Sequence, residues 1–96
     1  MSPEAKVKKK VYKILKDNKA YYFSPIMTGY GKMGVPDVIA CYRGVFIAVE
    51  CKAGKNKPTE LQQKNLDDIG TAGGYSLVIN ESNLSELRCV LEKIGG

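Results

Sequence analysis

Residues 36–53, PDVIACYRGVFIAVECKA, decide the fold of this chain. They contain two strand-like runs, 37–42 and 45–53, separated by the dipeptide Arg43-Gly44. Two β-prone runs joined by a two-residue turn predict a β-hairpin. Both runs are apolar on both faces, which is typical of central strands covered by helices on each side of a sheet. The chain is therefore expected to have a layered α/β fold around this hairpin.

The expected hairpin register brings charged residues together at its open end. A two-residue turn pairs Tyr42 with Val45, and the same register places Asp37 opposite Glu50. Directly opposed residues have Cβ atoms about 4.5–5.5 Å apart, and like charges in that arrangement are unfavourable. A divalent cation is the simplest compensation, because hard cations bind carboxylate oxygens. Lys52 follows two residues after Glu50 and therefore projects from the same face.

Each of these charged residues also has an interpretation without catalysis. Glu50 and Lys52 could form an ion pair at a strand end, which contributes little to stability. Asp37 could simply start its strand after Pro36. The three groups nevertheless interrupt the most apolar strands of the chain and converge on one small patch. Their combination favours a metal-dependent active site.

The segments outside the hairpin predict the order helix, strand, strand, strand, helix, strand, helix within one domain that spans all 96 residues. The expected elements are a helix from Ser2 to about Asp17, a strand within 20–27, a glycine-rich loop over 28–35, a helix over 59–72, a strand over 75–80, and an amphipathic helix with Leu84, Leu87, Leu91 and Ile94. Ser2 is expected to cap the first helix, with Pro3 at its first position. Pro25 limits the first strand to an edge or a bend, and Gly73-Gly74 is placed to end the second helix.

Two further side chains are candidates for the site. Glu4 lies three residues before Val7 and seven before Val11, so it belongs to the apolar stripe of the first helix. An acidic residue in a first helical turn is also common without any function. Gln62 completes a T-x-x-Q sequence that begins at Thr59 and is typical of a capping box, and this role is favoured for it.

The net charge of +5 is distributed unevenly along the chain. The first helix carries Lys6, Lys8, Lys9, Lys10, Lys13 and Lys16, and a second cluster contains Lys52, Lys55 and Lys57. Basic clusters attract polyanions by neutralising phosphates and releasing counterions, but they also serve simply to keep a protein soluble. The glycine-rich loop from Thr28 to Gly34, which carries Lys32, could approach a phosphate backbone or be an ordinary connection.

The residue types that are missing limit the chemistry. Histidine is absent, which removes imidazole catalysis and nearly all zinc sites. The three cysteines, Cys41, Cys51 and Cys89, have no C-x-x-C spacing and are expected to be buried, reduced thiols. No apolar run approaches the roughly 20 residues that span a bilayer, and the N-terminus lacks the apolar block of a signal peptide. The expected compartment is therefore the cytoplasm, with no membrane partner.

These motifs resemble those of a known nuclease family. They are Gly34-Val35-Pro36-Asp37, Glu50-Cys51-Lys52 and the run 59–74 (TELQQKNLDDIGTAGG), in which Gln62 falls on the family's glutamine. They are similar to the VRR-NUC family (virus-type replication-repair nucleases) of the PD-(D/E)XK superfamily. The resemblance covers nearly the whole chain. It implies a restriction-endonuclease-like αβββαβα core with a central mixed sheet flanked by helices.

The resemblance implies Mg²⁺- or Mn²⁺-dependent hydrolysis of phosphodiester bonds in DNA. The metal ligands that it implies are Glu4, Asp37, Glu50 and the backbone carbonyl of Cys51. It gives Lys52 the catalytic lysine role and Gln62 a supporting role. A cysteine at position 51, where valine is usual, leaves that carbonyl unchanged.

The family's compact members also suggest a substrate and an assembly. They look like phage proteins and are similar to archaeal Holliday-junction resolvases, which act as homodimers. Branched DNA, a second copy of the chain and, for a phage protein, the host cytoplasm are therefore expected. The lysines expected to contact DNA are Lys8, Lys9, Lys32, Lys55 and Lys57.

Two other classes of function stay open on the sequence. A nucleic-acid-binding module without catalysis could use the basic first helix with Tyr21, Tyr22 and Tyr30, and would need no metal. An interaction protein could present the leucine stripe of its final helix to a partner, although such a stripe is more often core or dimer packing. Within the nucleases, a flap or duplex enzyme is the alternative to a junction resolvase.

Overall fold

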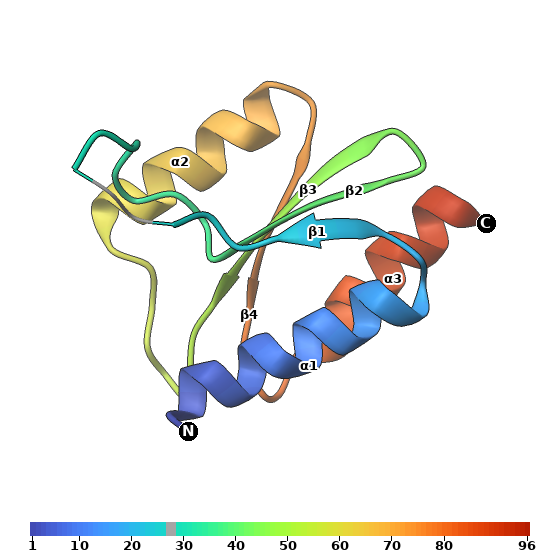
Figure 1. Cartoon of the computed structure of the whole chain (residues 1–96), viewed down its shortest axis with the longest axis horizontal. Helices are drawn as coiled ribbons and strands as arrows, with labels where there is room; N and C mark the ends of the chain where they lie inside the picture. Colours follow the sequence, from blue (N-terminus) through green and yellow to red (C-terminus); the bar gives the residue numbers. More distant parts are fainter. Residues whose placement is uncertain (27–28) are drawn as a thin grey trace.

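The computed structural model describes residues 1–26 and 29–96. Its elements are α1 (Pro3–Asp17), β1 (Tyr21–Phe23), β2 (Val38–Tyr42), β3 (Val45–Cys51), α2 (Glu60–Thr71), β4 (Tyr75–Ile79) and α3 (Leu84–Gly95), in the predicted order (Figure 1). The expected strand within 20–27 and the expected loop over 28–35 each include a position outside the described residues. In the part of the chain that is described, no helix is long and apolar enough to cross a membrane.

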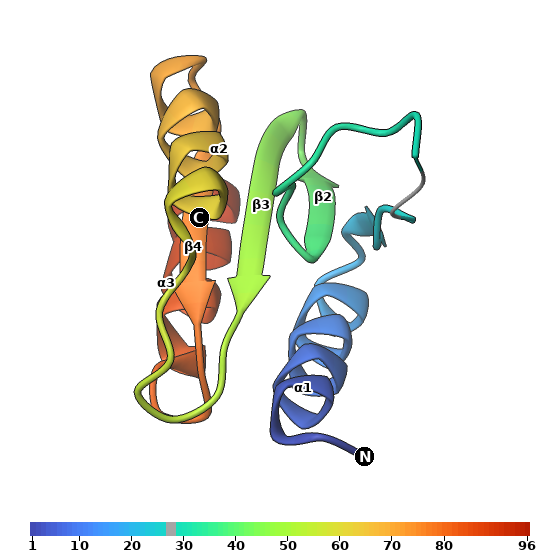
Figure 2. The same cartoon turned by 90° about the vertical axis from the view of Figure 1, so that its left-hand side faces the viewer.

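The described strands form one mixed sheet in the order β1-β2-β3-β4. β1 and β3 both pair with β2 in antiparallel orientation, and β4 joins β3 in parallel after the crossover through α2. Helices α1 and α3 lie on one face of the sheet, and α2 lies on the other (Figures 1 and 2). The expected α/β class, with a mixed sheet flanked by helices, is confirmed at this level.

The hairpin of β2 and β3 has the register expected from a two-residue turn. The pairing extends to Val38 and Val49 near the open end. Arg43 and Gly44 have φ angles of 50° and 80°. Positive φ at both central residues is characteristic of a type I′ turn, whose twist matches that of the strands. The turn therefore fixes which residues face each other at the open end.

The core lies between the sheet and the helices α1 and α3. The residues buried there are Val7, Val11, Ile14, Leu15, Val38, Ala40, Ile47, Val49, Cys51, Ile79, Leu87 and Leu91. The leucine stripe of α3 belongs to this core, since Leu87 and Leu91 are fully buried. These leucines are not presented to a partner, which counts against an interaction role for that face of α3.

Capping interactions fix the ends of α1 and α2 as the sequence predicts. The hydroxyl of Ser2 accepts a hydrogen bond from the backbone N–H of Ala5 at 3.1 Å. At the end of α2, Gly73 has a φ of 101°, and the N–H of Gly74 donates to the carbonyl of Ile69 at 3.0 Å. This pattern is a Schellman motif, in which glycine accepts the left-handed conformation without strain. The chain can therefore turn sharply from α2 into β4.

The prediction that all the thiols are buried is wrong for two cysteines. All three thiols are free, but Cys41 and Cys89 are exposed and only Cys51 is buried. Cys41 lies on the side of β2 that faces away from the core, and Cys89 lies on the outer face of α3, between the buried Leu87 and Leu91. A cysteine side chain is small enough to occupy an exposed position as well as a buried one. The number of cysteines therefore does not show which thiols are buried.

The side of the sheet that carries α2 is only partly covered, contrary to the expectation for central strands. Ile39, Cys41 and Phe46 face this side, and both Cys41 and Phe46 are exposed. Helix α2 packs mainly against β4 and leaves β1 and β2 open. An apolar pattern on both faces of a strand does not distinguish a face covered by a helix from a face that stays open.

Candidate active site

Asp37 and Glu50 face each other at the open end of the hairpin. They are the next pair in the register after Val38 and Val49. The Asp37 carboxylate accepts a hydrogen bond from the backbone N–H of Cys51 at 2.8 Å, which fixes its orientation. The opposition of two carboxylates that the turn predicts is therefore confirmed.

Glu50 is a buried carboxylate with an incomplete set of partners. It is 2% exposed, and its Oε2 lies 3.3 Å from Nζ of Lys52. The other oxygen, Oε1, is buried and has no hydrogen-bond partner among the described residues. Burial raises the pKa of Glu50 to about 6, the charge of Asp37 adds to this increase, and Lys52 opposes it. The ionised form of Glu50 is therefore disfavoured by its surroundings, and a cation beside Oε1 would offset that cost.

Lys52 completes the charged patch on the α2 side of the sheet. Its side chain is largely buried, and its ion pair with Glu50 confirms that the two residues share a face. The backbone N–H of Lys52 donates to the carbonyl of Ile79 at 3.0 Å, which continues the pairing of β3 with β4 past Cys51. The ion pair alone agrees equally with a role in structure. The unpaired oxygen of Glu50 is the feature that a simple ion pair does not explain.

The carboxylate pair fits a hard divalent cation. A buried oxygen without a hydrogen bond, beside a second carboxylate, offers the ligands that Mg²⁺ and Mn²⁺ prefer. Within residues 1–26 and 29–96, however, no group of three or more acidic, cysteine or histidine side chains is arranged to hold a metal ion. The chain would thus supply two carboxylates, and Mg²⁺ usually keeps several waters in such a site.

Glu4 lies near this end of the sheet without joining the two carboxylates. It is partly buried in the first turn of α1, beside the core residue Val7. Burial raises the pKa of the Cys51 thiol to about 12, and neighbouring carboxylates, Glu4 among them, add to the increase. Glu4 is therefore within electrostatic reach of the end of β3. The protonated thiol packs in the core, so the backbone carbonyl is the group that Cys51 can offer to a metal.

Gln62 forms the helix cap that its sequence context favours. The N–H of Gln62 donates to the hydroxyl of Thr59 at 3.2 Å, and the N–H of Thr59 donates to Oε1 of Gln62 at 2.9 Å. Both halves of the capping box are present at the start of α2. The carbonyl oxygen of Gln62 is thus engaged by the backbone. A role beside the carboxylates would have to use the amide nitrogen or break the cap.

The lysines expected to contact DNA do not lie on one surface. Lys55 and Lys57 are exposed in the connection from β3 to α2, which leaves the sheet at the end where the carboxylates lie (Figure 1). Lys32 lies on the α2 side of the sheet. Lys9 is exposed on α1, on the opposite side, and Lys8 is partly buried there with its Nζ 5.9 Å from the ring centroid of Tyr12.

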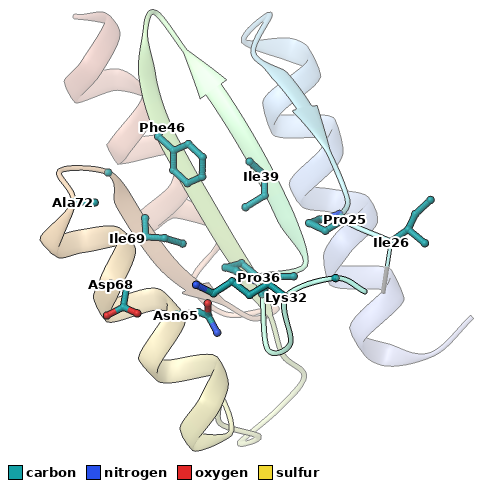
Figure 3. Close-up of a pocket in the computed structure, with 13 residues that line it drawn as sticks. Pro25, Ile26, Lys32, Pro36, Ile39, Phe46, Asn65, Asp68, Ile69 and Ala72 are labelled. Atoms are coloured by element: carbon teal, nitrogen blue, oxygen red, sulfur yellow. The ribbon is translucent and has the colours of Figure 1, made fainter. Parts of the chain in front are cut away.

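An open groove on the α2 side of the sheet was not foreseen from the sequence. Its volume is about 710 Å³, and Figure 3 shows it between α2 and the segment after β1. The residues that line it are Pro25, Ile26, Gly31, Lys32, Val35, Pro36, Ile39, Phe46, Asn65, Asp68, Ile69, Ala72 and Gly74. The signal available in the sequence was the hairpin register, which places Ile39 and Phe46 on the same face as Asp37 and Glu50.

The buried side-chain amide of Asn65 on α2 hydrogen-bonds to the loop that precedes β2 at this groove. Asn65 is 6% exposed, and its Nδ2 donates to the carbonyl of Met33 at 3.1 Å and to that of Leu61 at 3.0 Å. Next to these hydrogen bonds, Gly34 has a φ of 72°, and a Cβ there would lie 2.6 Å from Cγ of Leu61. Glycine is therefore required where the loop meets the helix, just before the Pro36-Asp37 sequence that leads into β2.

Comparison of the chain with models of known protein families gives no match, and comparison with curated proteins gives none either. The resemblance to VRR-NUC nucleases therefore rests on the motifs in this sequence.

Proposed function

We propose that this chain is a metal-dependent DNA endonuclease of the VRR-NUC type, with the restriction-endonuclease-like core that this family implies. The observation that supports the proposal most is the buried, unpaired Oε1 of Glu50, opposite Asp37 and on the same face as Lys52. A structural ion pair requires neither a second carboxylate nor an unpaired oxygen. Both features suit a cation site, because Mg²⁺ binds through one or two carboxylates and several waters.

In this proposal, each residue of the patch has a separate task. Asp37, Glu50 and the Cys51 carbonyl would hold Mg²⁺ or Mn²⁺, with Glu4 as the further ligand that the resemblance implies. When bound, the ion polarises the scissile phosphate and makes the attacking water more acidic. Lys52 orients that water and offsets the negative charge that develops on the phosphate in the transition state.

The substrate in this proposal is branched DNA, with the four-way junction as the first candidate, and the acting form is a homodimer. Two identical sites related by a two-fold axis suit the two symmetric strands that a resolvase must cut. A polyanionic substrate agrees with the net charge of +5. Such an enzyme belongs in the cytoplasm, that of the host if the protein is encoded by a phage.

The proposal is tested by cleavage of labelled four-way-junction, flap and linear duplex DNA with Mg²⁺, with Mn²⁺ and with EDTA. We expect paired, symmetric nicks in the junction that disappear with EDTA and with Lys52→Ala. Cleavage of flaps or duplex instead would support the nuclease function and reject the junction as its substrate. Tight binding without cleavage under every metal condition would favour the binding module.

The metal-ligand role of Asp37 predicts a selective loss in Asp37→Asn. Loss of a group that only hydrogen-bonds to a metal ligand typically lowers activity about 10–100-fold, so loss of a ligand itself should lower cleavage by more than about a hundredfold. Binding of the junction in EDTA and the midpoint of thermal unfolding should stay near the wild-type values. Asp67→Asn, at an exposed position on α2, is the matched control and should cleave normally. Retained cleavage by Asp37→Asn would remove Asp37 from the active site.

A further inference from the structure

A row of exposed aromatic side chains, with the partly buried Ile39 among them, crosses the open part of the sheet beside the candidate site. Tyr21 pairs with Cys41 and Phe23 pairs with Ile39, so these four side chains share the α2 side of the sheet. Phe46, paired with Cys41, continues the row on β3. Tyr21 is 72% exposed, Phe23 48% and Phe46 45%. We call Tyr21, Phe23, Ile39 and Phe46 the aromatic platform.

The aromatic platform is continuous with the groove and shares a face of the sheet with the carboxylate pair. Ile39 and Phe46 form the floor of the groove, and Figure 3 shows their side chains between α2 and Pro25. Asp37 lies two residues before Ile39 on the same strand face, which is roughly 7 Å along a β-strand. A chain molecule lying on the aromatic platform is therefore directed along this strand face toward the end of the hairpin where Asp37 lies.

The arrangement of the rings suits stacked bases. The ring centroids of Tyr21 and Phe23 are 6.3 Å apart with their planes tilted by 57°, and both rings lie on the edge strand, where each is about half exposed or more. Stacking of a base on an aromatic side chain strengthens binding of a single strand and tolerates any base, because every base has a π-face. Bases in a duplex are hidden in their own stack, so only unpaired bases can use such rings. Tyr22 does not contribute, because it points to the core side and stacks on Tyr12 with centroids 5.3 Å apart.

The net charge of the chain favours a nucleic acid over a second copy on the aromatic platform. Lys32 and Asp68 both line the groove and Lys52 is paired with Glu50, so the attraction for a polyanion comes from the whole chain, which carries a net charge of +5. A second copy would bring the same net positive charge. A single strand brings bases for the rings and phosphates for the lysines.

We propose that the aromatic platform binds unpaired bases of a DNA strand and leads that strand to Asp37 and Glu50. The preferred substrate is then branched DNA that offers unpaired bases next to the cut, in a flap or at the branch point of a junction. This inference rests on the proposed nuclease function for its direction, but the binding itself requires no cleavage.

The test measures binding of a short single-stranded oligonucleotide that contains 2-aminopurine, in EDTA, by quenching of its fluorescence on stacking. Tyr21→Ala/Phe23→Ala should weaken binding about tenfold or more for each ring removed. Tyr21→Phe/Phe23→Tyr, which keeps both rings, should bind and quench like the wild type. Tyr21→Leu/Phe23→Leu, which keeps apolar area but no ring, should lose binding like the alanine variant. Blunt duplex of the same length should bind all four proteins equally.

Each outcome decides between occupants of the aromatic platform. Equal binding of the single strand by the wild type and both ring-free variants would overturn the proposal. A dimer measured by sedimentation that dissociates in the alanine variant and persists in the leucine variant would assign the aromatic platform to a second copy, and would also overturn it. If the alanine variant does not fold, the leucine variant decides, because it removes the same rings.

The failure of the nuclease function is distinguishable from the failure of this inference. Ring-dependent binding without cleavage of any DNA would support the aromatic platform and reject the nuclease. Cleavage that depends on Asp37 but not on the rings, at equal binding, would support the nuclease and reject the aromatic platform.

Discussion

Glu50 occupies a position on β3 where an apolar side chain would pack without cost. It is among the most buried residues of the chain, and its neighbours Val49 and Cys51 are fully enclosed. Its ion pair with Lys52 engages one oxygen, and the carboxylate of Asp37 opposes its charge. Carboxylates whose pKa is strongly perturbed by burial and by a neighbouring charge are concentrated at functional sites.

This burial predicts that Glu50→Gln stabilises the metal-free protein above pH 6. The pKa of Glu50 is raised from 4.5 to about 6, so the folded state favours the protonated form. Stability is therefore lost as the pH rises from 4.5 through 6, and the loss amounts to about 2 kcal/mol. Urea unfolding in EDTA should show a gain of that size for the variant at pH 8 and no gain below pH 4.5.

Glu92→Gln, at an exposed position on α3, is the control for Glu50→Gln and should not change stability at either pH. Added Mg²⁺ should raise the stability of the wild type but not that of the Glu50→Gln variant, because only the wild type gains a ligand for the cation. A Glu50→Gln variant that is less stable than the wild type at pH 8 in EDTA would show that the carboxylate is a structural ion pair.

At the scale of single elements, the turn between β2 and β3 sets the register that opposes the carboxylates. Gly44 has a φ of 80°, and a Cβ there would meet nothing within 4 Å. Gly44→Ala should therefore lose only about 1–2 kcal/mol, the cost of a side chain in the left-handed region. Gly29, which also has open space around its Cβ and no positive φ, is the matched control. Gly29→Ala should unfold at the same denaturant concentration as the wild type.

The start of α2 offers a way to separate the two roles of Gln62. Thr59→Ala removes a side-chain cap and should cost about 1 kcal/mol of stability. Gln62→Glu keeps an acceptor at the same position of the capping box, so its stability should match that of the wild type. If the glutamine acts only as a cap, Gln62→Glu also cleaves normally. Normal stability with a loss of cleavage would assign the amide nitrogen to the active site.

Most elements could be predicted from the sequence because their ends carry local signals. Ser2, Thr59 and Gly73 each act through hydrogen bonds within a few residues, so their sequence context determines the structure. The opposition of Asp37 and Glu50 followed from the turn in the same way. The first strand was harder to place, because Pro25 weakens its pairing signal and only Tyr21–Phe23 pairs with β2.

The open face and the distribution of lysines could not be predicted from local pattern. An apolar strand face looks the same in sequence whether a helix covers it or not, so the exposure of Phe46 depends on where α2 packs. Likewise, the spacing of Lys9 and Lys32 does not reveal that the sheet separates them. Both features depend on how layers far apart in the chain are stacked.

At the scale of the whole molecule, the position of the lysines predicts which of them govern the salt dependence of binding. Lys55→Ala/Lys57→Ala removes two exposed charges next to the end of β3. It should reduce the slope of log affinity against log salt by about 2, since each phosphate contact contributes about 0.9. The control Lys10→Ala/Lys16→Ala removes the same charge from α1 and should change the slope less. Equal changes in both variants would mean that the lysines act only through the net charge.

The hydrogen bond from Asn65 to the carbonyl of Met33 fixes the last part of the connection from β1 to β2 against α2. Positions after Met33 are held at α2 and lead directly to Asp37, so a change in length there would displace the carboxylate. An insertion near Gly29 would lengthen the connection before Met33 and leave the position of Asp37 unchanged, because long surface connections tolerate added residues at small entropic cost. The width of the groove can therefore diverge during evolution, or be engineered, while the cutting chemistry stays in place.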